Sequence, residues 1–416
     1  MAATTKKLDY ADVAPRASSS RAIRTEVVPS NGNTFNMSNT IIFDLPSNVQ
    51  NTFWDAQSSY VRLAFKNGNG APLNFESGGF PSCIRRVEML LGGQTLCSID
   101  NYNVLYQMMF DLDASQDFRD NAGKKLFGAA SGFEGEAVAN GATVSVAFPL
   151  ALTPIVQAQR YFPLIGREPL RIRMEIDSAL NSLNGGAADT EITISEVALV
   201  MYQLELGQSV MDQVVANSGG MFKMIMPSYQ HAQTTLAATS ASVAATLGFS
   251  MSSLNRVLVA ARRQTATQAN NFIGNRAQLG LVEANLTIGG VKYPQISIKD
   301  RTNNSAEVLA EALVSQRALL SYGHDSSINT GGLFSLTSGD GSEAAQTGKF
   351  LLDIDLESQF SPEGSLVAGI NCVGQVVQYN ATYTADGTNA HVIDIYGEHS
   401  IMCALDLQSL TWSIAV

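Results

Sequence analysis

The chain has 416 residues, of which 45% are hydrophobic and only 15% are charged, and its formal net charge is −11. Globular proteins average about 25% charged residues, so the faces of this protein suit burial against partner subunits. The acidic balance argues against sequence-specific binding to nucleic acid or direct neutralisation of a genome, because phosphate binding needs clustered Lys and Arg. The length allows two domains of roughly 200 residues each.

Residues 1–27 are predicted to form a flexible N-terminal arm, because chain ends are usually disordered unless contacts hold them. The arm is basic on an acidic chain, since it has five bases against the three acids Asp9, Asp12 and Glu26. It is either merely solvated or reaches a neighbouring subunit, an anionic membrane surface or nucleic acid, and the sequence leaves both interpretations open. The candidate contact residues are Lys6, Lys7, Arg16, Arg21 and Arg24.

Several features bear on where the protein folds. The N-terminal residues include no apolar core of the kind found in secretory signals. No stretch approaches the length of a membrane-spanning helix. The four cysteines show neither a CxxC pair nor zinc-ligand spacing, which favours buried free thiols and a reducing, cytosolic compartment. They are Cys83, Cys97, Cys372 and Cys403.

The first half of the chain predicts a succession of short strands. Residues 39–45 and 59–65 are β-type runs. In residues 170–177 apolar side chains alternate strictly with Arg, Glu and Asp, which predicts a strand with one buried and one solvated face. A further apolar run at residues 191–206 closes this half.

One pattern occurs twice. From Val87 and again from Val282, the chain reads apolar strand, Gly-Gly, second strand, Asp, then amphipathic helix. Adjacent glycines, here Gly92-Gly93 and Gly289-Gly290, permit positive φ at both central residues of a tight hairpin. The apolar residues of each helix recur at i, i+1, i+4 and i+5, which predicts a helix docked on a core by one face. Two copies in separate strand-rich halves indicate two similar domains.

The predicted fold class is all-β. Many short strands separated by Gly, Ser and Asn indicate antiparallel sandwiches rather than βαβ units. The predicted boundaries are a first β domain at residues 28–206, a connector at 207–220 and a second β domain at 221–416. Helix is expected in about one element per half and in the connector.

Three carboxylates in the second half form a candidate site. Asp353, Asp355 and Glu357 alternate with apolar residues and should therefore share one face of a strand. Such a face can hold calcium or a glycosidase carboxylate pair. The alternation alone explains the pattern, so a solvated strand face or a subunit contact is favoured.

No other motif indicates catalysis. His391 and His399 are the only close pair among the four histidines, and no matching third ligand accompanies them. No GxSxG motif, Walker loop or dinucleotide fingerprint is present, so we expect no catalytic residue, metal or cofactor. The basic concentration of the second half is interpreted as a charged loop facing a neighbouring subunit. It consists of Arg256, Arg262, Arg263 and Arg276.

The order of these segments resembles the double jelly-roll major capsid proteins of the adenovirus hexon, membrane-containing phage, large DNA virus and virophage lineage. In the first half the likeness lies in QSSYVRLAF (57–65) followed by CIRRVEMLLGGQTLCSIDNYNVLYQMM (83–109). In the second half it lies in GKFLLDIDLESQF (348–360) followed by GSLVAGINCVGQVVQYNATY (364–383). The resemblance covers nearly all of the chain after the arm.

This resemblance implies two tandem eight-stranded antiparallel jelly rolls, each with a short helix insertion. It implies a structural protein without catalysis or cofactor, synthesised in the host cytosol and located in the virion. Three chains would form a pseudo-hexagonal capsomer that tiles an icosahedral shell. Its partners would be further copies of itself, minor capsid or penton proteins and, through the N-terminal arm, an inner membrane.

Two other functions remain open from the sequence. A tandem β-sandwich that binds or cleaves carbohydrate would need Trp and Tyr on a concave face near carboxylates, yet Trp54 and Trp412 are the only tryptophans. A single-jelly-roll coat protein of a small RNA virus would need a long Arg-rich arm and a second domain unlike the first.

Overall fold

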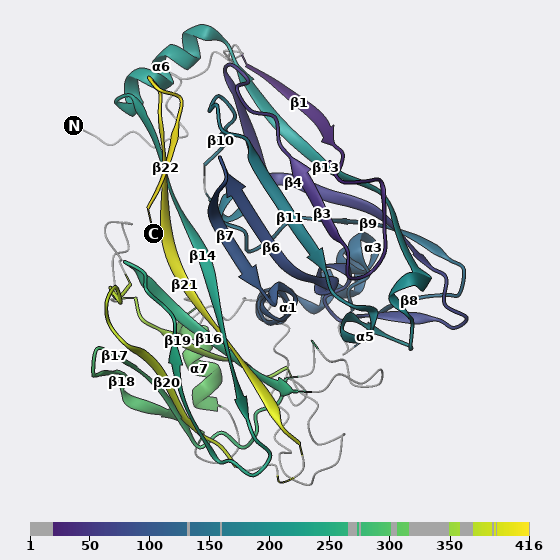
Figure 1. The fold of residues 1–416 in the computed structure, drawn as a ribbon, viewed down its shortest axis with the longest axis vertical. Helices are drawn as coiled ribbons and strands as arrows, with labels where there is room; N and C mark the ends of the chain where they lie inside the picture. The colour runs from purple at the N-terminus through teal and green to yellow at the C-terminus, as the bar shows by residue number, and fades with distance from the viewer. Residues whose placement is uncertain are drawn as a thin grey trace, which may run out of the picture.

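The computed structural model describes residues 20–130, 134–158, 160–264, 273, 276–300, 306–315, 349–357, 369–384, 387 and 389–415. These residues form two halves that lie side by side and are joined by helix α6 (Gln208–Ser218) (Figure 1). No strand pairing among the described residues joins the part before α6 to the part after it. Each half therefore builds its own sheets.

The first half contains two main antiparallel sheets. One follows the order β1-β13-β4, with β9 and β10 also paired to β4 and β2 to β13, and the other follows β3-β11-β6-β7. A small third sheet has the order β12-β5-β8. The bounds are β1 Ser20–Val27, β2 Thr34–Phe35, β3 Thr40–Asp44, β4 Thr52–Asn67, β5 Leu73–Glu76, β6 Ile84–Leu91, β7 Gln94–Asp100, β8 Glu134–Val138, β9 Thr143–Phe148, β10 Phe162–Pro163, β11 Leu170–Ile176, β12 Leu183–Asn184 and β13 Ile192–Leu206.

The second half also contains two antiparallel sheets. One follows β14-β21-β16-β19, with β22 paired to β21, and the other follows β15-β20-β17-β18. The bounds are β14 Met221–Leu236, β15 Ser242–Leu247, β16 Leu254–Arg263, β17 Glu283–Ile288, β18 Val291–Lys299, β19 Leu352–Asp355, β20 Val377–Thr382, β21 His391–Asp406 and β22 Trp412–Ala415.

The two halves share one pairing order. The path β1-β13-β4-β9 of the first half corresponds to β14-β21-β16-β19 of the second, and β3-β11-β6-β7 corresponds to β15-β20-β17-β18. All of these pairs are antiparallel, so the predicted all-β fold is confirmed. The short strands β2, β5, β8, β10, β12 and β22 lie outside the shared order.

The repeated Gly-Gly motif forms the same turn in both halves. Gly92-Gly93 joins β6 to β7 with φ of 59° and 84°, and Gly289-Gly290 joins β17 to β18 with φ of 57° and 85°. Positive φ at both central residues is what a two-residue type I′ hairpin requires. The hairpins predicted from the sequence are therefore confirmed.

Helices are more numerous than expected in the first half. Helix α1 (Tyr102–Asp113) follows the first hairpin as predicted, and α7 (Ala306–Ser315) occurs after the second. The expectation of about one helix is wrong for the first half, because short helical segments connect its strands, whereas α7 is the one helix among the described residues after α6. The short segments are η2 Phe80–Cys83, α2 Gln116–Phe118, η3 Arg119–Gly123, α3 Lys124–Phe127, α4 Pro154–Gln157, α5 Ala179–Ser182 and η4 Asp189–Glu191.

Helix α1 is buried around its whole circumference. Every residue from Tyr102 to Leu112 is buried, so the prediction that it docks by one face is wrong. The hydroxyl of Tyr396 on β21 donates to the carbonyl oxygen of Asn101 at its start, at 2.8 Å. The helix therefore contacts the second half as well as the core of its own half.

The expected N-terminal arm overlaps a strand. Residues 20–27 form β1, which pairs with β13 from Ser20↔Leu206 to Val27↔Leu199. The sheet supplies backbone partners for these residues, so the prediction of a flexible arm extending to residue 27 is wrong for its last eight residues. Residues 1–19 lie outside the described residues.

The strand predicted by strict alternation is β11. Leu170, Ile172, Met174 and Ile176 are buried, and the residues between them are exposed or half-buried. Asp177, assigned to the solvated face, lies beyond the strand end and is buried. No helix among the described residues is long and apolar enough to cross a membrane.

Candidate functional site

The sheet β14-β21-β16-β19 forms the interface between the halves. Its strands β21, β16 and β19 are largely buried on both faces, whereas β14 keeps one exposed face. Along β16, Val257 and Val259 pack into the core of the second half, whereas Leu258 and Ala260 join the core of the first half. On β21, Ile395 and its neighbour Tyr396 divide in the same way. Because successive side chains of a strand point to opposite faces, this one sheet contributes to two cores.

Asp394 on β21 is the centre of a polar cluster in this interface. Its side chain is fully buried, and Oδ2 lies 2.6 Å from Arg262 Nε. His231 Nε2 lies 2.9 Å from Oδ1, and the amide of Gln233 donates to Oδ1 at 2.8 Å. The side-chain amide of Asn101, from the first half, also donates to Oδ1 at 3.0 Å. The two halves thus share one buried carboxylate.

The charge of Asp394 is stabilised by its neighbours. Burial alone would raise the pKa of Asp394, but the Arg262 guanidinium and the hydrogen bond to His231 outweigh burial and hold it well below the ordinary value. The carboxylate is therefore ionised at neutral pH. Arg262 was interpreted as part of a charged loop facing a neighbouring subunit; that interpretation is wrong, because it lies in β16 and its partner is internal.

Asp111 on α1 forms a second buried cluster, with three cations. Its Oδ1 lies 2.9 Å from Arg119 Nη1 and 3.3 Å from Lys349 Nζ, and its Oδ2 lies 2.6 Å from Arg276 Nη2. Arg276 also donates to the carbonyl oxygens of Lys349 and Phe350, each at 3.0 Å. Since Arg276, Lys349 and Phe350 belong to the second half, this cluster ties the first helix to it.

The Asp111 cluster is almost wholly removed from solvent. The side chains of Asp111, Arg119 and Arg276 are 0% exposed and that of Lys349 is 4% exposed. Burial raises the pKa of Asp111, but Lys349, Arg276 and Arg119 together hold it well below the ordinary value. Burial also lowers the pKa of Lys349, against the opposing effect of Asp111. The interpretation of Arg276 as part of a charged loop facing a neighbouring subunit is also wrong, because its side chain is buried and pairs with Asp111 of the same chain.

The carboxyl-terminal strand also contacts the first half. The rings of Trp412 on β22 and Phe162 on β10 stack with centroids 4.9 Å apart and planes 6° apart. The backbone N–H of Trp412 donates to Glu168 Oε2 at 3.0 Å, and that of Arg167 donates to the carbonyl oxygen of Leu410 at 3.0 Å. These contacts fasten the end of the chain across the interface.

The three carboxylates proposed to share a strand face differ in environment. Asp353 is 0% exposed and lies 3.4 Å from Arg256 Nη1, while Arg256 Nε lies 2.6 Å from Glu398 Oε2. The prediction that Asp353 lies on a solvated strand face is therefore wrong. Its carboxylate is buried and forms an ion pair with Arg256 on the neighbouring strand β16. Asp355 and Glu357 are half-buried.

Asp353 gives a pH-dependent prediction. Burial raises the pKa of Asp353 to about 6 from its ordinary value of 3.8. Between these values the folded protein keeps a proton that the unfolded chain has lost, so stability falls as the pH rises through this window. Asp353→Asn should flatten the dependence of the unfolding free energy on pH from about 4 to 6. Denaturant titrations across this range measure it, with Asp355→Asn as the control; an unchanged slope in Asp353→Asn would contradict the assignment.

The three histidines that the structure describes do not come together. His391 is the first residue of β21, His399 lies in the middle of the same strand, and His231 belongs to the Asp394 cluster. Among the described residues no group of three or more His, Cys, Asp or Glu is placed to hold a metal ion. All four cysteines are buried free thiols.

Two of the predicted arm residues lie on β1, the edge strand of a sheet in the first half. Arg21 Nη2 lies 2.8 Å from Glu205 Oε2, and Arg24 Nη1 lies 3.3 Å from Glu26 Oε1. Both belong to β1, so they form side-chain pairs along a sheet. Lys6, Lys7 and Arg16 lie outside the described residues.

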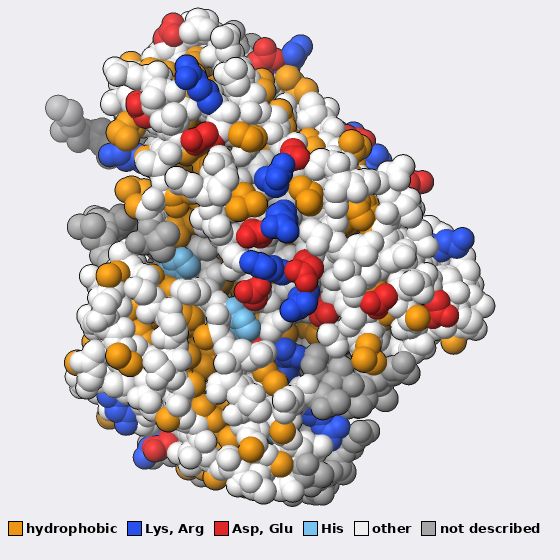
Figure 2. All heavy atoms as spheres, viewed as in Figure 1, with side chains coloured by type: hydrophobic (Ala, Val, Ile, Leu, Met, Phe, Trp, Pro, Cys, Tyr) orange, Lys and Arg blue, Asp and Glu red, His pale blue; other side chains and the backbone are white. Residues whose placement is uncertain are grey.

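The outer face of the sheet β3-β11-β6-β7 has a column of alternating charges (Figure 2). Arg171 pairs with Asp44 at 2.5 Å, and Arg173 pairs with Glu88 at 2.8 Å. Arg85 and Glu175 extend the column at 3.1 Å. Exposed pairs of this kind contribute little stability, so the column mainly gives this face a balanced charge.

The tryptophans do not form a carbohydrate-binding face. Trp54 is 1% exposed and Trp412 is 7% exposed. A sugar ring stacks on an exposed aromatic face, so neither residue is available for this role. The shared strand order of the halves likewise contradicts a coat protein with one jelly roll and a dissimilar second domain.

The structure is similar over almost its full length to solved viral capsid proteins. It matches a chain of the PBCV-1 virus capsid with a TM-score of 0.64 and 13% identity, covering 97% of this chain and 98% of that one. This is the double jelly-roll fold. The mavirus major capsid protein matches with a TM-score of 0.59 and 11% identity, covering 99% and 93%. The Faustovirus major capsid protein matches with a TM-score of 0.58 and 10% identity, covering 93% and 90%.

No family model and no curated protein matches the chain. The likeness to the solved structures at 10–13% identity lies in the fold, and it agrees with the resemblance suggested by the order of the sequence segments. Several strands and both hairpins of this fold can be predicted from the sequence. The roles of Asp111 and Asp394 cannot, because their only signal is an acid embedded in an otherwise apolar helix or strand.

Proposed function

We propose that this chain is the major coat protein of an icosahedral virus and that three copies form a pseudo-hexagonal capsomer. The observation that carries the proposal is the shared strand order of the two halves, together with the full-length likeness to viral major capsid proteins. Three chains with two similar halves each present six nearly equivalent units, which is the symmetry that a hexagonal array needs.

The buried interface supports this role. A building block of a shell must hold its two halves at a fixed angle, because every lateral contact depends on that angle. Here Asp111 and Asp394 connect the halves through charge-assisted hydrogen bonds in a dry environment. We propose that residues 28–206 and 221–416 are the two jelly-roll domains and that residues 207–220 connect them.

The proposed role is structural, without catalysis. Its partners are neighbouring copies of the chain, together with minor capsid or penton proteins, and its location is the virion after synthesis in the host cytosol. An inner membrane is a partner for the N-terminal residues. Since Arg21 and Arg24 are paired in β1, the bases for such a contact reduce to Lys6, Lys7 and Arg16.

Light scattering coupled to size exclusion tests the capsomer. The expected result is a stable particle with a mass near three times the 44.4 kDa of one chain. Negative-stain images of that particle should show a hexagonal outline. A stable monomer at micromolar concentration, or a trimer with a plainly triangular three-lobed outline, would contradict the proposal.

A further inference from the structure

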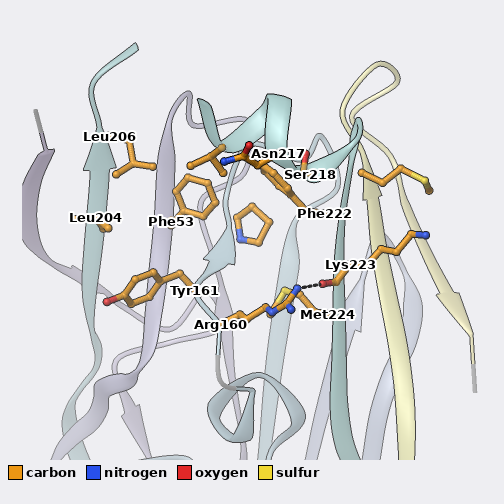
Figure 3. Close-up of a pocket in the computed structure, with 13 residues that line it drawn as sticks. Phe53, Arg160, Tyr161, Leu204, Leu206, Asn217, Ser218, Phe222, Lys223 and Met224 are labelled. Atoms are coloured by element: carbon orange, nitrogen blue, oxygen red, sulfur yellow. Dashed lines mark hydrogen bonds between the residues drawn. The ribbon is translucent and has the colours of Figure 1, made fainter. Parts of the chain in front are cut away.

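An apolar cleft lies under helix α6, at one end of the interface between the halves. It has a volume of about 750 Å³ and opens to solvent. The rings of Phe53 from β4 and Phe222 from β14 lie 5.9 Å apart within it (Figure 3). Leu206 at the end of β13 and Val214 on α6 complete its apolar lining. Both halves and the connecting helix α6 therefore contribute residues to the lining of the cleft.

The rim of this cleft is positively charged. Arg160 and Lys223 both line it, and the Arg160 guanidinium donates to the carbonyl oxygen of Lys223 at 2.8 Å (Figure 3). Both residues are exposed. No Asp or Glu occurs among the described residues that line the cleft. An occupant with apolar side chains and neighbouring carboxylates would complement this surface.

The N-terminal segment of the chain starts beside the cleft. Ser20, the first residue of β1, pairs with Leu206, which lines the cleft. Because β1 runs antiparallel to β13, the chain before Ser20 leaves the sheet at the end where α6 begins. The preceding 19 residues can span up to about 60 Å when extended, which is ample reach.

This segment has the composition that the cleft needs. Residues 8–13 read LDYADV, with Leu8, Tyr10 and Val13 interspersed with Asp9 and Asp12. Its acids match the cationic rim, and its apolar side chains match the lining. Residues 14–19 suffice as a linker to Ser20, and a short linker raises the effective concentration of the segment to the millimolar range.

We propose that residues 8–13 bind in the cleft under α6 of the same chain. Leu8, Tyr10 and Val13 contact the apolar lining, and Asp9 and Asp12 face Arg160 and Lys223. The segment then bridges both halves at the end of the interface opposite to the Asp111 cluster. This inference does not depend on the proposed coat function.

Disulfide trapping in the full-length chain tests the binding. Val13→Cys is combined with Val214→Cys in the cleft or, as the control, with Ala216→Cys on the opposite face of α6. The native cysteines are all buried and leave the background low. Under mild oxidation we expect an intramolecular disulfide to form at least about tenfold faster with Val214→Cys than with Ala216→Cys. Equal rates for the two pairs would overturn the proposal.

Two further measurements decide the occupant and its chemistry. A covalent dimer on a denaturing gel would show that the segment enters a neighbouring chain, which overturns the assignment to the same chain.

Adding Asp9→Asn and Asp12→Asn to the Val13→Cys, Val214→Cys variant should slow disulfide formation several-fold at low salt and remove most of its salt dependence. Unchanged trapping in that variant would contradict the role of the cationic rim. Unaltered thermal melting of the reduced variants verifies that each is folded.

Discussion

Asp111→Ala is expected to destabilise the folded protein by about 3–5 kcal/mol, because it leaves buried cations without their shared carboxylate. Arg119 and Arg276 would remain 0% exposed with no counter-charge at this position. Denaturant unfolding at pH 7 measures the loss. Asp113→Ala is the matched control, since Asp113 is exposed on the same helix and should change stability by less than about 0.5 kcal/mol.

A double variant separates the electrostatic explanation from simple loss of packing. If the uncompensated charge causes the damage, Arg276→Met should cost much less in the Asp111→Ala background than in the parent protein, because each change removes part of the same network. Additive losses would show that Asp111 and Arg276 act independently. That result would remove the argument that this cluster couples the two halves.

The strands and turns could be predicted because their signals are local. The alternation in residues 170–177 reports one solvated and one buried face, and β11 shows that division. The glycine pairs report positive φ, which the chain adopts at Gly92-Gly93 and Gly289-Gly290. Each of these signals depends on a few consecutive residues, so it can be interpreted without knowledge of the tertiary structure.

The interface could not be predicted because its partners are distant in the chain. Asp111 and Arg276 are 165 positions apart, and Asn101 and Asp394 are 293 apart. The local sequence suggests a charged loop at Arg262 and a solvated strand face or subunit contact at Asp353, because charged residues are mostly exposed. Arg262 is buried because the first half covers its face of the sheet β14-β21-β16-β19, and Asp353 is buried beside Arg256 and helix α7 of the second half.

The prediction that the N-terminal arm extends to residue 27 is wrong for a similar reason. The sequence SRAIRTEV of β1 has few apolar residues, and its Arg and Glu suggest a solvated segment. Its stability comes from backbone pairing with β13, which no local pattern reveals. An edge strand needs only one partner strand and one modest apolar face, so polar composition does not exclude it.

Trp412→Ala is expected to cost about 3–5 kcal/mol, as large aromatic truncations in well-packed sites do. The residue is 7% exposed and stacks on Phe162, so the loss falls on the contact between the halves. Hydrogen exchange should accelerate in residues 160–168 and 410–415 and change little in the hairpin at Gly289-Gly290. Trp412→Phe retains a stacking ring and should recover more than half of the loss. Uniform acceleration across both halves would mean that Trp412 supports global stability rather than the interface.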